Sequence, residues 1–136
     1  MLTESEIDLL GGKDLNTAVA EYIFGEKKPT VGLHEEGHIY PITSGQGWMC
    51  SPQYDLGDDC EWEPFPFGTD ISCAWSIVER APKGWSVSIA KTFSGAWRCD
   101  YGVKSVIAHR PEIAICKAAL KALTTERSVY VHTGPS

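Results

Sequence analysis

The sequence predicts an α+β fold, a layered sandwich in which helices pack against an antiparallel sheet of three or more strands. Residues 69–123 have the pattern helix, strand, strand, strand, helix with short connections. Strands joined by hairpins form an antiparallel sheet, and its apolar face needs helices over it. A chain of 136 residues with 43% apolar and 22% charged residues is typical of a single domain that buries one core.

The first 25 residues predict two N-terminal helices. Thr3 and Glu6 have the spacing of a capping box at the start of the first helix. Asp14 opens the second helix, and Gly25 ends it. The apolar stripe predicted for the second helix consists of Leu15, Ala18, Val19 and Tyr22.

Residues 26–68 predict an insert of a different kind. Glycine and proline recur so often there that no helical period survives, and we expect long loops with short strands. The stretches 30–34 and 38–40 flank a turn at 35–37, which predicts a hairpin. We expect three aromatic residues to tie the insert to the core: Trp48, Tyr54 and Trp62.

The core region, residues 69–123, begins with a helix capped by Thr69 or Asp70. The stripe predicted to be buried on this helix consists of Ile71, Ala74, Trp75 and Val78. Three strands follow it. In the first, alternation predicts an inward-facing set of Trp85, Val87 and Ile89.

In the second strand, Cys99 has the same parity as Trp97 and Tyr101 and is therefore expected to face the core. The third strand is predicted at 104–109. Pro111 occupies the first turn of the last helix, where proline is tolerated. The apolar stripe predicted for that helix consists of Ile113, Cys116, Leu120 and Leu123. Residues 124–136 form a tail with one strand-like piece at 128–132.

The motif His34-Glu35-Glu36-Gly37-His38 has the H-E-x-x-H spacing of zinc hydrolases. That chemistry needs a helix, on which the two histidines share one face and the glutamate acts as general base. Gly32 and Pro41 bracket the motif, so the sequence favours an exposed turn. A metal-dependent hydrolase built on this motif remains the alternative function.

A structural zinc site is the second metal hypothesis. Its residue types are supplied by His34, His38, Cys50 and Cys60. The spacing of these residues matches no common zinc finger, because fingers usually pair their cysteines two to four residues apart. We therefore expect no bound metal and no other cofactor.

The aromatic and acidic side chains of the insert are assigned to contact with a protein partner, because aromatic anchors carry much of the energy of interfaces. The assigned residues are Trp48, Tyr54, Asp55, Asp58, Asp59, Glu61, Trp62 and Glu63. The acidic run lacks the order of an EF-hand loop. The alternative is a solvated loop without a partner.

The net charge of −6 is distributed unevenly. Residues 1–68 hold 13 acidic and 3 basic side chains, a net of −10, and residues 69–136 hold 5 acidic and 9 basic ones, a net of +4. Phosphates repel the acidic half, which suits a basic protein surface instead. The helix-strand-strand-strand-helix order is also that of double-stranded RNA-binding domains, but the start of the last helix offers too few cations for that role. We do not expect direct binding of nucleic acid.

The cellular location is predicted from what the chain lacks. Its acidic N-terminus has no apolar run of the kind a secretory signal needs. No stretch approaches the roughly 20 apolar residues of a membrane span. The five cysteines form no C-x-x-C pair, and we expect free thiols in a reducing cytoplasm.

Four runs of the sequence occur in the order of a known family pattern. They read V-A-E-Y-I-F-G at 19–25, T-D-I-S-C-A-W-S-I-V-E at 69–79, G-W-S-V at 84–87 and A-I-C-K-A-A-L at 114–120. The set resembles the phage ABA-sandwich family. The corresponding patterns of that family, in the same order, are V-A-E-x-V-M-G-W, T-D-I-x-x-A-W-x-V-V-E, G-W and A-x-x-R-A-A-L. Glu26 stands where that family has tryptophan, and Lys117 where it has arginine.

The resemblance implies a layered sandwich of helices and strands and a phage or prophage origin. It implies no particular activity and supplies no catalytic residues. We therefore predict a non-enzymatic phage accessory protein in the host cytoplasm that binds a host or phage protein, with inhibition of a bacterial defence system as the role considered. A protein that sequesters a small ligand or nucleotide between insert and sheet is a further alternative. The sequence sets no oligomeric state.

Overall fold

The computed structural model describes residues 2–28, 42–52 and 60–124. Its elements confirm the α+β class. In chain order they are α1 (Glu4–Leu9), α2 (Gly12–Ala18), the π-helical turn η1 (Val19–Ile23), β1 (Ile42–Ser44), β2 (Trp48–Pro52), β3 (Cys60–Pro64), α3 (Ile71–Glu79), β4 (Val87–Lys91), β5 (Trp97–Tyr101), β6 (Lys104–Ala108) and α4 (Pro111–Thr124).

The strands of the core region form an antiparallel sheet in the order β4-β5-β6, as predicted. Cys99 lies opposite Ile89 on one neighbouring strand and opposite Val106 on the other. The side chains of Cys99 and Tyr101 are fully buried, which confirms the parity predicted for β5. Helix α4 packs against β5 and β6 and covers this face of the sheet.

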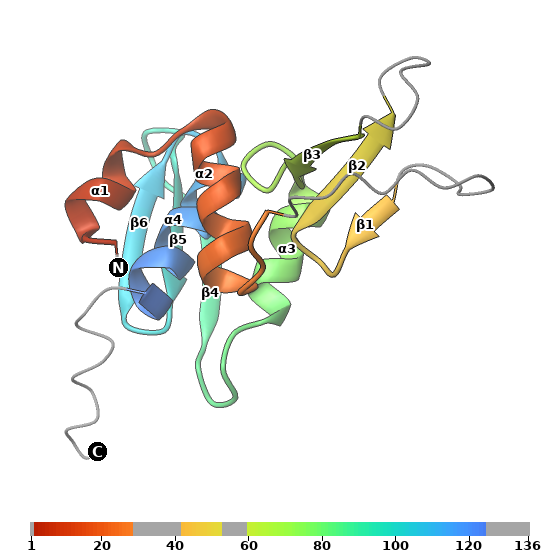
Figure 1. Cartoon of the computed structure of the whole chain (residues 1–136). Coiled ribbons are helices and arrows are strands. Elements are labelled where there is room, and N and C mark those ends of the chain that lie inside the picture. The colour runs from red at the N-terminus through yellow and green to blue at the C-terminus, as the bar shows by residue number, and fades with distance from the viewer. Residues whose placement is uncertain (1, 29–41, 53–59, 125–136) are drawn as a thin grey trace.

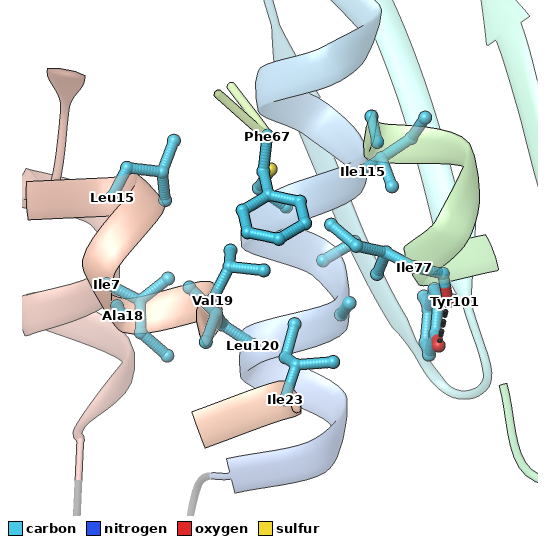
Figure 2. Packing of buried hydrophobic residues seen from close by; sticks show 14 of the residues in the cluster. Ile7, Leu15, Ala18, Val19, Ile23, Phe67, Ile77, Tyr101, Ile115 and Leu120 are labelled. Carbon is cyan, nitrogen blue, oxygen red and sulfur yellow. Dashed lines mark hydrogen bonds between the residues drawn. The ribbon is translucent and has the colours of Figure 1, made fainter. Parts of the chain in front are cut away.

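Helix α4 lies at the centre of the core. It is buried over much more than the predicted stripe, because α1, η1 and α3 pack on the sides that the sheet does not cover. Figure 2 shows apolar side chains from η1, α3 and α4 meeting around the ring of Phe67. The alanines of α4 are buried along with its larger residues, and their small size permits close approach from several sides.

The predicted stripe of the second N-terminal helix was wrong at Tyr22. Leu15, Ala18 and Val19 are buried as expected, but Ile23 is buried and Tyr22 is exposed. The cause is η1, in which the backbone N–H of Phe24 donates to the carbonyl oxygen of Val19, five residues earlier. A π-helical turn adds one residue to the helical repeat and so shifts the buried side of the chain by one position.

Helix α3 begins where the sequence placed it. The Asp70 carboxylate accepts hydrogen bonds from the backbone N–H groups of Ser72 and Cys73, at 2.8 and 3.2 Å. The predicted buried face needs correction, because the helix buries Ala74 and Ile77 while Ile71 and Trp75 are each 48% exposed. Contact with α4 selects the Ala74–Ile77 side.

The insert contains a second sheet, antiparallel and in the order β1-β2-β3. Figure 1 shows this sheet projecting to one side of the helices, at the right of the view. Trp48, Trp62 and Phe67 are buried in the common core, so the two tryptophans tie the insert to the core as predicted, and its short strands form a sheet. The predicted hairpin over 30–40 and the strand-like piece at 128–132 lie outside the described residues.

One carboxylate fixes the second sheet to the helices. Glu26 accepts hydrogen bonds from the backbone N–H groups of Gln46 and Gly47, both at 2.8 Å, in the turn between β1 and β2. Its own carbonyl oxygen accepts a 2.8 Å bond from the indole Nε1 of Trp48. Arg80 adds a contact at the end of α3, where its guanidinium lies 4.9 Å from the centre of the Phe24 ring.

Candidate protein-binding surface

Some of the predicted contact residues of the insert are buried, one is exposed, and others lie outside the described residues. Trp48 and Trp62 are buried, so in this arrangement they hold the second sheet in place and present no contact surface. Glu63 is exposed on β3, and Glu61 precedes it by two residues on the same strand. Tyr54, Asp55, Asp58 and Asp59 lie outside the described residues.

The metal hypotheses concern residues of the insert. His34 and His38, with the rest of the H-E-x-x-H motif, lie outside the described residues. Cys50 and Cys60 belong to β2 and β3, where Cys50 is aligned with Trp62 and Cys60 with Pro52. Across residues 2–28, 42–52 and 60–124, no three or more His, Cys, Asp and Glu side chains are grouped to hold a metal ion.

An apolar pair on α3 is exposed. Ile71 and Trp75 are four residues apart and therefore share one side of the helix, and each is 48% exposed. The exposed carboxylates of Asp70 and Glu79 lie at the two ends of the same helix. We call this set the α3 face: Asp70, Ile71, Trp75 and Glu79. Large apolar side chains with a polar rim are typical of interaction sites.

The sequence did not indicate the α3 face, because the helical stripe predicted to be buried includes Ile71 and Trp75. A competing signal was present. Ala74, Ile77, Val78 and Ala81 also recur with helical spacing. This second stripe is the one that the structure turns toward α4, and it leaves Trp75 on the outside.

The face of the sheet opposite α4 carries a polar ladder at its centre. Ser88, Asp100 and Ser105 are aligned across the three strands, and both serine hydroxyls donate to the Asp100 carboxylate. Arg98 Nε adds a 3.1 Å contact. The bond from Ser105, followed by those from Arg98 and Ser88, holds the pKa of Asp100 below its ordinary value. All these donors belong to the sheet itself, which indicates a structural role for the ladder.

The cysteines of the core are free thiols with no sign of activation. Cys99 and Cys116 are buried and Cys73 is partly buried. Burial raises the pKa of Cys99 to about 12 and raises the pKa of Cys116 and Cys73 as well. A nucleophilic cysteine needs a lowered pKa and access to solvent, so these three behave as small apolar side chains.

The N-terminal end of α4 carries one arginine that could contact a phosphate, Arg110. Arg110 Nη2 lies 3.2 Å from Glu112 Oε2, and its Nε lies 3.2 Å from Oε1. A longer bond of 3.4 Å joins Nη2 to the carbonyl oxygen of Thr69. Glu112 is buried, so the guanidinium is engaged in balancing a buried carboxylate. The cation at this end of α4 is therefore held by a carboxylate of the same helix.

Comparisons with known proteins agree with the fold described above. Residues 17–120 match the sequence model of the Phage ABA sandwich domain. The chain is also similar to a phage protein from Bacillus cereus ATCC 14579 whose crystal structure was determined at 2.0 Å. The two are 23% identical with a TM-score of 0.53, over 85% of this chain and 94% of the other, and at that identity the likeness shows the fold alone. No curated protein matches the chain. No helix among the described residues is long and apolar enough to cross a membrane.

Proposed function

The chain belongs to the phage ABA sandwich domain family, and from this premise we propose that it is a phage accessory protein that acts without catalysis, by binding a host or phage protein. The proposed place of action is the cytoplasm of the bacterial host. The observation that carries the proposal is the exposure of Ile71 and Trp75 between two carboxylates on α3.

Tryptophan is the residue most enriched among the side chains that dominate binding energy at interfaces. Burying the exposed half of the Trp75 side chain, on the order of 100 Å², would contribute about 2–3 kcal/mol at ~25 cal/mol per Å². Ile71 adds apolar area one helical turn away. Trp75 also lies in the run that matches the family's A-W pair, although it contributes little to the buried core.

The charge pattern supports a basic partner. Asp70 and Glu79 flank the apolar pair, and residues 1–68 carry a net charge of −10. A surface of this sign attracts a basic protein surface and accelerates its association. A host defence protein that binds nucleic acid has such a surface, and the chain would inhibit it by occupying the groove that phosphates otherwise fill.

Affinity purification of the tagged chain from phage-infected cells, followed by mass spectrometry, tests this proposal. Trp75→Ala is expected to reduce the recovered partner at least about tenfold, because it removes the central apolar contact. Leu9→Ala is the matched control, since Leu9 is an exposed apolar residue on α1. A partner that both variants recover equally would contradict a role for the α3 face.

The insert is tested by a second arm of the same experiment. Replacing Asp55, Asp58 and Asp59 together with lysine reverses the charge of the assigned acidic run. We expect this variant to lose the partner if the insert forms part of the contact. Loss in the Trp75→Ala variant alone would restrict the surface to α3.

A further inference from the structure

Among the residues that the structure describes, strand β4 has no hydrogen-bonded neighbour on one of its sides. It lies at an edge of the sheet β4-β5-β6. The carbonyl oxygen of Ser86 accepts a hydrogen bond from Gly102 N–H, and Thr92 N–H donates one to the carbonyl oxygen of Ala96. In an antiparallel pair every second residue is hydrogen-bonded to the partner strand, so these two bonds identify which residues of β4 bond to β5. The even-numbered residues therefore bond to β5. The N–H and C=O groups of Val87, Ile89 and Lys91 point away from it, and no described residue bonds to them.

Within residues 2–28, 42–52 and 60–124, this edge lacks the features that normally protect an edge strand. Edges are usually blunted by proline, bulges, charges or a covering element. β4 contains no proline, and its register with β5 runs without a bulge from Val87 to Lys91. Its one charged residue is Lys91, whose ammonium lies 5.9 Å from the centre of the Trp97 ring. At the opposite edge, the Lys104 ammonium of β6 is bound by Glu4 of α1, which Figure 1 shows beside β6.

We propose that β4 pairs with β4 of a second copy of this chain, antiparallel and centred on Ile89. In this register Ile89 faces Ile89 of the other copy, and Val87 faces its Lys91. The backbone groups of these residues have no partner in the described part of the chain, so all three positions can form hydrogen-bonded pairs across the dimer axis. The β4-β5-β6 sheet of one copy and that of the other then form one continuous sheet across the dimer axis.

The side chains support a second copy as the occupant. The two-fold axis places each Lys91 opposite a valine, so the two ammonium groups do not face each other. Trp85 and Phe93 stand four residues before and after Ile89 and are exposed, Trp85 by 38% and Phe93 completely. The same axis brings the end of β4 that carries Trp85 to the end that carries Phe93 in the other copy, and both aromatic residues gain apolar contact.

The proposed dimer contact does not involve the α3 face, and analytical ultracentrifugation of the full chain tests it. The wild-type protein is expected to sediment as a dimer at about 100 µM. Phe93→Ser is expected to raise the dimer dissociation constant at least about tenfold, since it removes an aromatic contact twice per dimer. Leu9→Ser removes an exposed apolar side chain from α1 and should leave the constant unchanged.

Cross-linking tests the register. Ser88 and Ala90 of opposite copies form non-hydrogen-bonded pairs with Cα atoms about 4.5 Å apart, within the range that a disulfide spans. The double variant Ser88→Cys, Ala90→Cys should therefore give an intermolecular disulfide under mild oxidation, above the background of the parent protein. Neither single variant should do so, because residue 88 never faces residue 88.

Three outcomes would overturn the proposal. The first is a wild-type protein that stays monomeric at about 100 µM, which would mean that the β4 edge does not bind a second copy. The second is a dimer that Phe93→Ser does not weaken. The third is a cross-link in the Ser88→Cys variant alone, which requires a different register.

Discussion

The hydroxyl group of Tyr101 donates a 2.8 Å hydrogen bond to the carbonyl oxygen of Ile77, in the interior of the protein (Figure 2). This bond joins the central sheet to α3, because Tyr101 ends β5 and Ile77 lies in the last turn of α3. It helps to fix which side of α3 faces inward. The exposure of Trp75, and with it the proposed binding surface, depends on that orientation.

The variant Tyr101→Phe is expected to lose about 0.5–1.5 kcal/mol of unfolding free energy, the usual net value of one buried hydrogen bond. The loss stays modest because the Ile77 carbonyl oxygen keeps a bond from the Arg80 backbone N–H. Urea denaturation measures it. Tyr22→Phe, at an exposed tyrosine, serves as the control and should change stability by less than about 0.5 kcal/mol. Equal stability of both variants would show that the Tyr101 bond contributes nothing.

Stability is expected to fall as the pH rises above about 9. Burial raises the pKa of the Cys99 thiol to about 12 from an ordinary value of 9.0, and that of Tyr101 to about 12 from 10.0. At a pH between the ordinary pKa and the raised pKa of each group, the unfolded chain releases a proton that the folded chain retains, so the free energy of unfolding declines as the pH rises. Urea midpoints from pH 8 to pH 11 measure the decline. Tyr101→Phe should make the slope shallower above pH 10, and a flat profile would contradict the assignment.

The variant Glu26→Ala is expected to loosen the second sheet while leaving the first sheet intact. The carboxylate accepts hydrogen bonds from two backbone N–H groups of the β1–β2 turn. A hydrogen bond to a charged group contributes about 1.5–3 kcal/mol to the free energy of unfolding. Hydrogen exchange should accelerate in β1, β2 and β3, with β5 unchanged. Glu21→Ala on the exposed side of η1 is the control. Uniform acceleration in both sheets would show that the bond supports the whole fold.

The docking of α1 is expected to weaken in acid. A hydrogen bond from the Lys104 ammonium holds the pKa of Glu4 below its ordinary value of 4.5. A lowered folded-state pKa stabilises the fold above the unfolded value and ceases to do so as the pH falls through the folded value. Because the Glu4 side chain is 43% exposed, the effect is below about 1 kcal/mol. Glu4→Gln should flatten the profile below pH 4.5, and an unchanged profile would contradict the ion pair.

The purified protein is expected to contain no stoichiometric zinc. The H-E-x-x-H motif is bracketed by a glycine and a proline, which disfavours the helix that its zinc chemistry requires. Elemental analysis of protein expressed in zinc-supplemented medium measures the content. One zinc per chain that is lost in both His34→Ala and His38→Ala would contradict this expectation and support one of the two zinc hypotheses, since both use these histidines.

Local signals in the sequence predicted the start of α1 and the elements of the core region well. Asp70 caps α3 and Thr3 with Glu6 forms the predicted capping box, since each such contact spans only two or three residues. The alternation around Cys99 predicted the buried face of β5 for the same reason. Signals of this kind depend on neighbouring residues and are complete in the sequence.

The candidate site was predicted less well. Trp48 and Trp62 were assigned both to a partner contact and to the attachment of the insert to the core, and their burial fits the second assignment alone. The tryptophan of α3 was expected in the core and is half exposed. Both errors concern which of several apolar side chains meets another element, and the spacing of residues in one segment carries no information on that choice.

By itself, the sequence determined the class of fold, the caps, the order of the strands in the core sheet and the family. Only the tertiary structure decided that β1, β2 and β3 form a second sheet, that η1 shifts the buried position from Tyr22 to Ile23, and that Trp75 lies outside. The reason is that burial depends on contacts between segments distant in the chain. Helix α3 has two apolar stripes of similar length, and packing against α4 and Tyr101 selects one of them.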